Sequence, residues 1–394
     1  MPQNSAEEGL VRPEAIDPSP LVAGIVEWVE METPSDRPDL IDRLLDHVER
    51  AFEGLPVERR RIPGRDGCGG QLVLRYAPDG VEGKPAVLMG HIDTVWDAGT
   101  LAERPVRRDG DRLHGPGIFD MKAGSYLATE TLRRIAAAGL KPPRPIVVYL
   151  NGDEETGSET SRATIEELAA GAAFVLVPEP SFEAPGTVIT ARKGWARFTL
   201  TAHGVSSHAG GNLADGRSAI REIARQILDI EALNETESAA TFNVGTVTGG
   251  TRSNVVPAKA TIEVDMRAND LPTAERLVTA MLARQPQGAD ITLEASGGLN
   301  RPPFVRSPAV ARFYEATQAL AAGLGLPMAE TSRGGVSDGN FAAALGVPVL
   351  DGLGCSGAGA HAVHEHILVS TVAPRAALMH GMLMSPSFQE AALG

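Results

Sequence analysis

Gly90-His91-Ile92-Asp93-Thr94-Val95 follows the apolar run Ala86–Met89 and places an imidazole two residues before a carboxylate. The apolar run predicts a buried strand that carries His91 to its end. Side chains two residues apart on a strand point to one face, so Asp93 is expected behind His91, where it can accept the second ring proton. That arrangement is typical of metal-bound histidines, although a polar pair at a strand end is the commoner case. A metal site therefore requires further ligands elsewhere in the chain.

The composition describes a packed, acidic protein. The 394 residues are 43% hydrophobic, and 36 Lys and Arg stand against 50 Asp and Glu, for a net charge of −14. This length predicts two or three domains. Because no long basic run occurs, nucleic acid and anionic membranes are poor candidate partners. Only Cys68 and Cys355 occur, the N-terminus does not resemble a signal peptide, and no apolar run has membrane-spanning length. We therefore expect a cytoplasmic protein without a disulfide framework or a thiolate zinc site.

Strand and helix patterns alternate through the first half of the chain and return near its end. Strands are predicted at 71–76, 86–89, 146–150, 173–177 and 347–350, and helices near 19–32, 37–54, 124–138, 160–170, 309–323 and 373–384. This alternation predicts an α/β fold with a mostly parallel sheet flanked by helices, and a site at the C-terminal ends of the strands.

The pattern changes between residues 195 and 305. Strands at 198–202, 242–247, 260–266 and 291–295 combine with helices at 217–233 and 272–284. The order β-α-β-β-α-β is the ferredoxin-like arrangement. We therefore predict a discontinuous catalytic domain, residues 1–194 and 306–394, interrupted by an inserted α+β domain, residues 195–305.

Candidate metal ligands recur at the predicted strand ends. Asp120 lies in a glycine-flanked turn, Glu155 follows one strand, Glu179 follows another, and His361 lies in a late glycine-rich segment. Each alone could be a helix cap or a solvated charge. Together with His91 they describe a co-catalytic two-metal site, in which two ions share a hydroxide. Asp120 is the candidate bridge, His91 and Glu179 would complete one ion, and Glu155 and His361 the other.

The donor set also indicates the metal and the base. Mixed imidazole and carboxylate ligands favour two Zn²⁺ ions, with Co²⁺ or Mn²⁺ as substitutes. Glu154 and Glu155 are adjacent, and on an extended segment they would point in opposite directions. Glu155 could then bind metal while Glu154 acts as the general base that moves a proton from water to the leaving amine.

With these residues the chain resembles the two-zinc metallopeptidases of the aminoacylase, acetylornithine deacetylase, succinyl-diaminopimelate desuccinylase and glutamate carboxypeptidase group. The resemblance is closest to the glutamate carboxypeptidase branch. The motifs that carry it are Gly-His91-Ile-Asp93-Thr, Gly-Ile-Phe-Asp120-Met-Lys, Asp-Glu154-Glu155-Thr-Gly-Ser, Pro-Glu179-Pro, Ser-Ser-His208-Ala-Gly and Gly-Ala-His361 with Glu365 four residues later.

The resemblance implies further features. The inserted domain would be a lid that also forms a homodimer, and the Asp120–Met121 peptide would be cis. His208 would stabilise the tetrahedral oxyanion, possibly in the partner's site. Arg267 would hold a substrate carboxylate through its planar fork, and Asn254 would hydrogen-bond beside it. Without the resemblance, His208 reads as a loop histidine and Arg267 as a salt-bridged surface arginine.

Two departures from the family pattern affect specificity and ligand choice. Ser332 stands where the glutamate branch has an arginine, with Arg333 next to it, which puts a preference for glutamate in doubt. His364 and His366 lie beside His361, and we favour His361 because Glu365 then falls at the family's spacing.

The predicted activity is hydrolysis of a peptide or N-acyl-amino acid amide, with release of a C-terminal amino acid that has a free carboxylate. A deacylase or deaminase acting on a non-peptide substrate at the same two-metal site is the alternative. A binding or regulatory protein that has lost its metals on the same scaffold is a third possibility.

Overall fold

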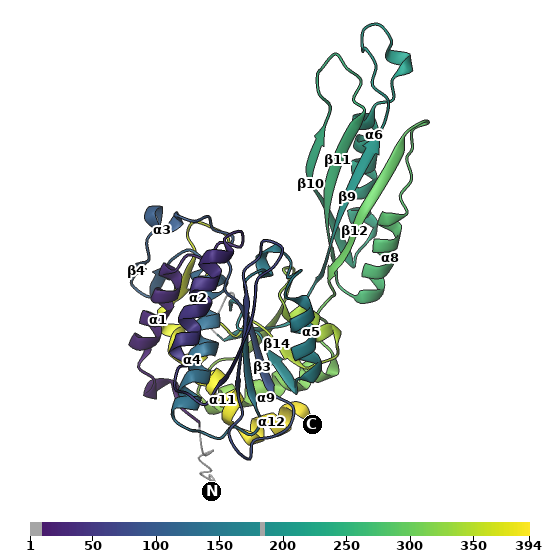
Figure 1. Cartoon of the computed structure of the whole chain (residues 1–394). Helices are drawn as coiled ribbons and strands as arrows, with labels where there is room; N and C mark the ends of the chain where they lie inside the picture. The colour runs from purple at the N-terminus through teal and green to yellow at the C-terminus, as the bar shows by residue number, and fades with distance from the viewer. Residues whose placement is uncertain (1–9, 182–185) are drawn as a thin grey trace. The chain divides into compact units, whose positions relative to one another are not determined.

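The computed structural model describes residues 10–181 and 186–394, which form two compact units (Figure 1). The second unit consists of Arg192–Val305 and Arg333–Val336, and the first contains the other described residues. The predicted insert, residues 195–305, begins three residues later and lacks Arg333–Val336. The short segment joins the second unit because the Lys193 N–H donates to the Arg333 carbonyl at 3.0 Å, and the Arg192 guanidinium donates to the carbonyls of Gly335 and Val336.

A six-stranded sheet forms the centre of the first unit. Its order is β1-β2-β6-β3-β7-β14. The strands are β1 Glu58–Ile62, β2 Gln71–Tyr76, β3 Ala86–His91, β6 Ile146–Asn151, β7 Phe174–Leu176 and β14 Val349–Leu350. Strands β6, β3, β7 and β14 pair in parallel, whereas β2 is antiparallel to both of its neighbours. Every residue of β3 and β6 is buried, as expected for strands covered on both faces.

Helices cover the sheet, which confirms the predicted α/β class. The α-helices of the first unit are α1 Pro18–Glu30, α2 Pro38–Ala51, α3 Thr100–Glu103, α4 Ala123–Ala137, α5 Arg162–Gly171, α9 Pro308–Gly323, α10 Gly339–Ala344, α11 Val372–Met384 and α12 Pro386–Leu393, and α3 buries none of its residues. Helix α4 lies in the connection from β3 to the adjacent strand β6. Helix α5 lies in the connection from β6 to β7, which passes over β3 in the opposite direction along the sheet. Because both crossovers are expected to be right-handed and run in opposite directions along the sheet, the two helices lie on opposite faces (Figure 1).

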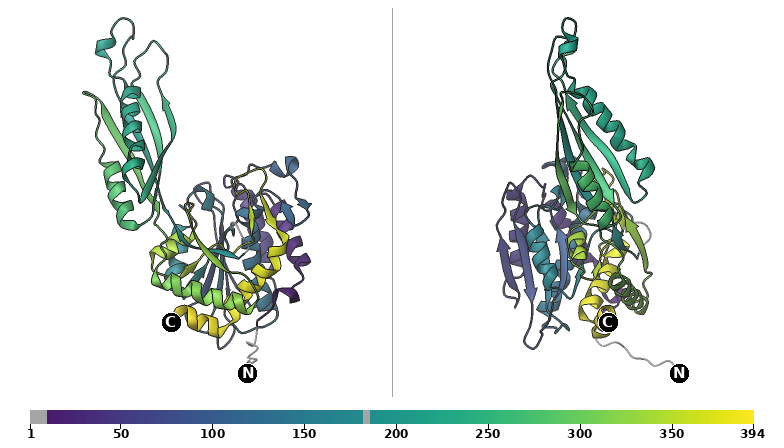
Figure 2. Two further views of the ribbon diagram at one scale, coloured as in Figure 1. Left: turned by 180° about the vertical axis from the view of Figure 1, so that it is seen from behind. Right: turned by 90° about the vertical axis from the view of Figure 1, so that its right-hand side faces the viewer.

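The second unit has the predicted β-α-β-β-α-β order. Its sheet runs β10-β11-β9-β12 and is antiparallel throughout. Its elements are β9 Gly194–His203, α6 Ala219–Glu231, α7 Leu233–Thr236, β10 Ala240–Gly249, β11 Lys259–Ala268, α8 Leu271–Leu282 and β12 Thr292–Arg301. Helices α6 and α8 cover one face (Figure 2), and β11 alternates buried with more exposed residues accordingly.

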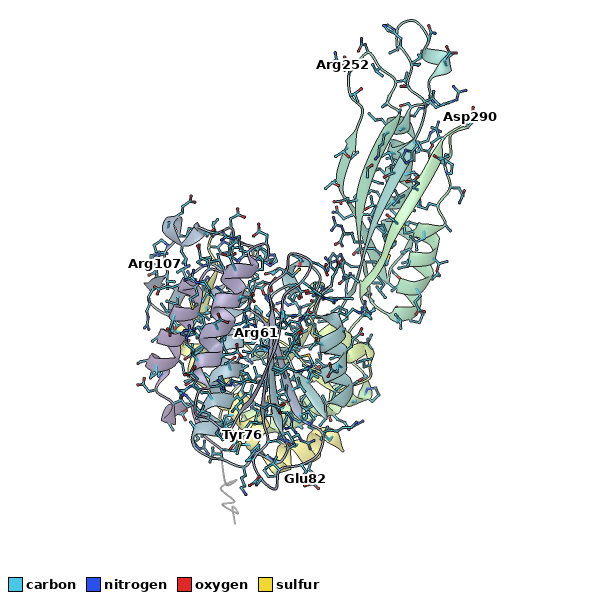
Figure 3. The ribbon with its side chains drawn as sticks, in the orientation of Figure 1. Arg61, Tyr76, Glu82, Arg107, Arg252 and Asp290 are labelled. Atoms are coloured by element: carbon cyan, nitrogen blue, oxygen red, sulfur yellow. The ribbon has the colours of Figure 1, made fainter. Side chains whose placement is uncertain are left out.

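Several short or charged elements were not predicted. They are β1, β4 Arg107–Asp109, β5 Arg112–His114, β8 Thr187–Arg192, β13 Ala329–Arg333, β15 Gly357–Ala358, β16 His366–Leu368, and helices α3, α7, α10 and α12. Strand β1 has the sequence Glu-Arg-Arg-Arg-Ile and lies at the sheet edge, where charges are common and apolar alternation is weak. Arg61, labelled in Figure 3, ties it to α2 through Asp42 at 2.9 Å. Among the described residues, none of the helices combines the length and apolar composition that spanning a membrane requires.

Candidate metal centre

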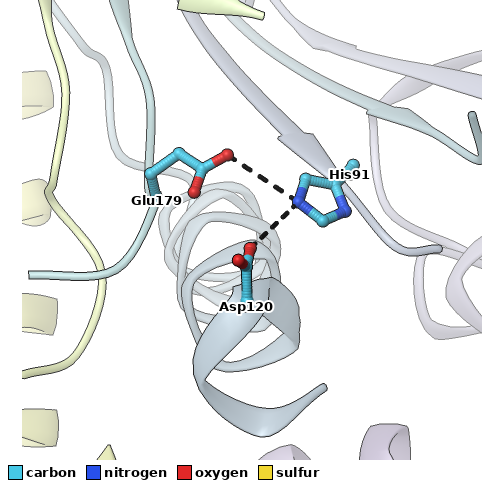
Figure 4. A group of neighbouring side chains, drawn as sticks. All are labelled: His91, Asp120 and Glu179. Atoms are coloured by element: carbon cyan, nitrogen blue, oxygen red, sulfur yellow. Dashed lines mark ion pairs between the residues drawn. The ribbon is translucent and has the colours of Figure 1, made fainter. Parts of the chain in front are cut away.

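His91 occupies the last position of β3 and is buried. Its Nδ1 lies 3.0 Å from the Asp93 carbonyl oxygen and 3.4 Å from the Asp93 carboxylate. Both are acceptors, so the ring proton is placed on Nδ1 and the Nε2 lone pair is available. Nε2 faces Asp120 Oδ1 at 3.3 Å and Glu179 Oε1 at 3.7 Å (Figure 4).

Asp120 faces two histidines at once. It lies in the turn Ile118–Lys122, where its backbone is not helical, and the Asp120–Met121 peptide is cis, as the family resemblance implied. While Oδ1 faces His91, Oδ2 lies 3.4 Å from His361 Nε2. The carboxylate therefore has the orientation that a bridge between two ions requires.

The five predicted ligands form two groups that share Asp120. One contains His91, Asp120 and Glu179, the other Asp120, Glu155 and His361, and within each group the ligand atoms all lie within 4.8 Å of one another. His361 Nε2 is 3.2 Å from Glu155 Oε2. In the described part of the chain His364 and His366 belong to neither group, and the His366 ring is bonded to the His364 carbonyl instead.

The electrostatics of the two groups favour cations. Hydrogen bonds to Asp120 and Glu155 raise the pKa of His361 to about 10. Burial alone would lower the pKa of His91, but Asp120 and Asp93 raise it well above its usual value. Burial raises the pKa of Glu155, whose Oε1 is buried and has no hydrogen-bond partner among the described residues. An unpaired buried carboxylate oxygen is costly, and a metal ion would relieve this cost, so the residues present fit a metal centre.

Glu154 and Glu155 are placed by a 3-10 turn, Glu154–Thr156. The expectation of an extended segment is therefore wrong. Since a 3-10 helix has three residues per turn, successive side chains still diverge, by roughly 120°. Glu155 joins the second ligand group, while Glu154 is in neither group and its negative charge raises the pKa of His91. Glu154 is therefore close to the centre without being needed as a ligand.

Asp93 anchors this turn as well as His91. It follows β3 instead of lying within it, and its carboxylate accepts hydrogen bonds from the Ser35 hydroxyl at 2.8 Å and from the N–H groups of Glu154 and Glu155 at 3.2 and 3.1 Å. The sequence indicated only the contact with His91. The N–H contacts could not be predicted because they depend on where β6 ends relative to β3.

Replacing Asp93 with Ala is expected to weaken metal binding or turnover by about 10- to 100-fold, because His91 and the turn lose their common acceptor while all ligands remain. Chelator competition and steady-state kinetics measure the two effects. The Ser35→Ala variant, which removes one donor, should show a smaller change. Unchanged metal affinity and turnover in Asp93→Ala would reduce the pair to a structural contact.

Glu365 has a role that the sequence did not reveal beyond its spacing from His361. It is buried, and Oε1 accepts from the N–H groups of Phe119 and Asp120 at 2.9 and 3.1 Å, while Oε2 accepts from Gly117 N–H and Trp96 Nε1, both at 2.8 Å. Burial raises its pKa to about 7, and the four donors act in the opposite direction. The carboxylate thus holds the turn that presents Asp120.

We expect Glu365→Gln to lower metal affinity by about 10-fold or more, because an amide presents a donor to N–H groups that need an acceptor. The absorption spectrum of the Co²⁺-loaded variant should also change, which a fold defect elsewhere would not cause. Trp96→Phe removes one of the four donors to Glu365 and, as the control, should cause a smaller loss of metal affinity. A wild-type cobalt spectrum and affinity would exclude this role for Glu365.

His208, Asn254 and Arg267 belong to the second unit. His208 Nδ1 accepts from the N–H groups of Gly210 and Gly211, at 3.1 and 3.0 Å, so the ring proton is placed on Nε2. The Ala209 N–H donates to the Asn254 carbonyl at 3.0 Å, which brings His208 and Asn254 together. Arg252, labelled in Figure 3, lies with Asn254 on the loop between β10 and β11.

Within one chain, Arg267 does not lie beside Asn254. Asn254 precedes the Lys259 end of β11, whereas Arg267 is eight residues further along the strand, about 26 Å away at 3.3 Å per residue. The Arg267 fork binds the Asp265 carboxylate, with contacts of 2.8 and 2.9 Å, and packs over the Trp195 ring. In the structure Arg267 is therefore a salt-bridged arginine, paired with Asp265.

Comparison with known proteins identifies the family. The model of "Peptidase family M20/M25/M40" matches residues 87–385, a range that contains all five candidate ligands. The chain belongs to this family. Carboxypeptidase G2 from Pseudomonas sp. (strain RS-16) is 31% identical over 386 residues, which cover 94% of this chain and 90% of that protein. Succinyl-diaminopimelate desuccinylase from Acidovorax ebreus (strain TPSY) is 31% identical over 315 residues, or 74% of this chain and 78% of that protein.

The solved structures agree on the fold. A tripeptidase from Staphylococcus aureus subsp. aureus Mu50 superposes with a TM-score of 0.75 at 22% identity, covering 93% of this chain and 98% of that one. Membership of the M20/M25/M40 family makes the chain a metal-dependent hydrolase, and the predicted relationship to the carboxypeptidase and desuccinylase group is confirmed. Family membership thus supports a metal-dependent hydrolase over a metal-free binding protein.

Proposed function

We propose that the chain is a two-metal amide hydrolase that releases an amino acid with a free carboxylate from a dipeptide or N-acyl-amino acid. The observation that carries this proposal is the orientation of Asp120, with one carboxylate oxygen toward His91 and the other toward His361. The proposed cofactor is two Zn²⁺ per subunit, or Co²⁺ or Mn²⁺ in their place, held by His91, Asp120, Glu155, Glu179 and His361.

The residues of the chain divide the chemistry between them. When bound, the ions supply Lewis acidity and lower the pKa of water. Glu154 takes a proton from the attacking water and donates it to the leaving amine. The His208 Nε2–H donates to the oxygen on which negative charge develops. Asp93 holds His91 and Glu154 in position, because its carboxylate lies beside the His91 ring and accepts a hydrogen bond from the Glu154 N–H.

A second copy of the chain completes this proposal. A substrate whose carboxylate is bound by Arg267, in exchange for Asp265, cannot also contact Asn254 of the same chain across about 26 Å of strand. We infer that His208 and Asn254 act in the site of a partner subunit, so the enzyme is a homodimer through the second unit. A cytoplasmic location belongs to the same proposal and agrees with two cysteines that are both free.

The test is a substrate screen of protein loaded with zinc. N-acyl-amino acids and dipeptides with C-terminal Glu, Asp, aromatic or aliphatic residues are incubated with the enzyme, and the free amino acid and ammonia are quantified. We expect metal-dependent release of the amino acid. Release of ammonia alone would favour the deaminase alternative, and no product from protein that binds two ions would reject the proposal.

A further inference from the structure

A pocket of ≈ 720 Å³ adjoins the candidate metal centre, and none of the proposed proton-transfer or oxyanion-binding residues lines it. Glu155, of the second ligand group, forms part of its wall, together with Ser35, which donates to Asp93, and Thr94, which follows Asp93. All of these residues belong to the first unit. The pocket therefore reaches the centre at Glu155, so a substrate bound at the centre can extend into it.

The other ionisable groups of the wall are mostly acidic. Asp36, Asp66, Asp97 and Glu159 line the pocket against one cation, Arg65. Arg65 is already engaged, because it donates to the Thr160 carbonyl at 3.2 Å and its Nε is 4.0 Å from Asp66. The four carboxylates and one guanidinium have a formal sum of −3, so the pocket repels anions and attracts cations.

Acidic side chains at a surface are often only solvated, so exposed carboxylates alone do not indicate a binding site. The buried carboxylate in the wall, Glu155, is more informative. The Glu155 side chain is 8% exposed, and its Oε1 has no hydrogen-bond partner among the described residues. Glu155 therefore joins the pocket wall to the second ligand group, and its unpaired buried oxygen indicates that a ligand-binding centre lies next to the pocket. The exposed carboxylates then line the approach to that centre.

We propose that this pocket binds the acyl part of the substrate and selects acyl groups that carry a positive charge, foremost the free α-ammonium of an aminoacyl group. The inference rests on the proposed amide hydrolysis and narrows it to unblocked dipeptide-like substrates. Neutral N-acyl groups bind less well, and acyl groups with a second carboxylate, such as succinyl, bind worst because they meet like charge.

The experiment uses three substrates that share one C-terminal amino acid and differ in acyl charge: the glycyl (+1), acetyl (0) and succinyl (−1) derivatives. We expect kcat/KM to fall by about 10-fold or more at each step, and the differences to shrink at high salt because the wall is exposed. A flat or reversed order in the wild-type enzyme would overturn the inference while leaving amide hydrolysis intact.

Matched variants separate the pocket charge from direct binding of the amine to metal. The double variant Asp66→Asn, Glu159→Gln should reduce the glycyl preference by about 10-fold, whereas Glu390→Gln on α12, outside the pocket, should not change it. Asn tolerates the left-handed backbone at Asp66, so the variant should fold. A glycyl preference that survives the double variant would overturn the inference.

A binding measurement keeps the inference testable apart from turnover. Glu154→Gln protein loaded with zinc is titrated calorimetrically with the same series. The expected order of affinity is glycyl, then acetyl, then succinyl. Failure of the wild-type enzyme to hydrolyse any of the three would count against the proposed function, and affinity independent of acyl charge would count against the pocket.

Discussion

Glu154→Gln is expected to lower kcat by about 10²- to 10⁴-fold while both metal ions remain bound. The amide keeps the size of the side chain but cannot accept a proton from water or return one to the leaving amine. Glu154 lies in neither ligand group, so its replacement should leave the metal content unchanged. Metal analysis and steady-state kinetics on the same preparation measure both quantities.

The neighbouring residue provides the matched control. Glu155→Gln changes the same functional group one position along the same turn, yet it should lose metal because Glu155 belongs to the second group. The two variants are thus expected to separate metal binding from proton transfer. Near-wild-type turnover in Glu154→Gln, or equal metal loss in both variants, would reject the assignment of the base.

His208→Ala is expected to lower kcat by about 10²- to 10³-fold, which is typical of losing one donor to a developing oxyanion. Two backbone N–H groups occupy Nδ1, so the proton on Nε2 is fixed in the position from which it can be donated. His203→Ala is the control, because His203 lies on β9 in contact with Glu294 and should not affect turnover.

Mixed dimers test whether His208 acts in the partner's site. His208→Ala protein is mixed with Glu154→Gln protein under conditions that exchange subunits. If His208 acts across the interface, one site of each hybrid combines an intact Glu154 with an intact His208, and activity returns. If both residues act within one chain, no hybrid site is complete. Absence of activity in verified hybrids, or a monomer mass by light scattering at micromolar concentrations, would remove the role in trans.

The sequence predicts much of this protein because its chemical residues come with local context. His91, Asp120, Glu155 and Glu179 each follow an apolar strand or a glycine turn, and parallel strands bring such ends together. Apolar alternation likewise predicts the ferredoxin-like order of the second unit. The structure agrees with both.

The supporting contacts could not be predicted, because no local pattern records them. The donors to Glu365 are 245 to 269 residues away in the chain, and only the folded sheet brings them together. Edge strand β1 could not be predicted because its charged sequence lacks apolar alternation. The predicted strand 260–266 already separates Asn254 from Arg267 within one chain.

The hydrogen bonds between Glu365 and the Asp120 turn also have a consequence for the order in which the metal centre is completed during synthesis. During translation the turn with Asp120 emerges early, but the carboxylate that accepts its N–H groups, and His361 nearby, emerge more than two hundred residues later. The nascent chain therefore carries four of the five candidate ligands once Glu179 has been made, but it lacks His361 and the acceptor of the Asp120 turn until nearly the end of synthesis. Completion of the second ligand group is expected to be a late event that coincides with docking of the C-terminal segment.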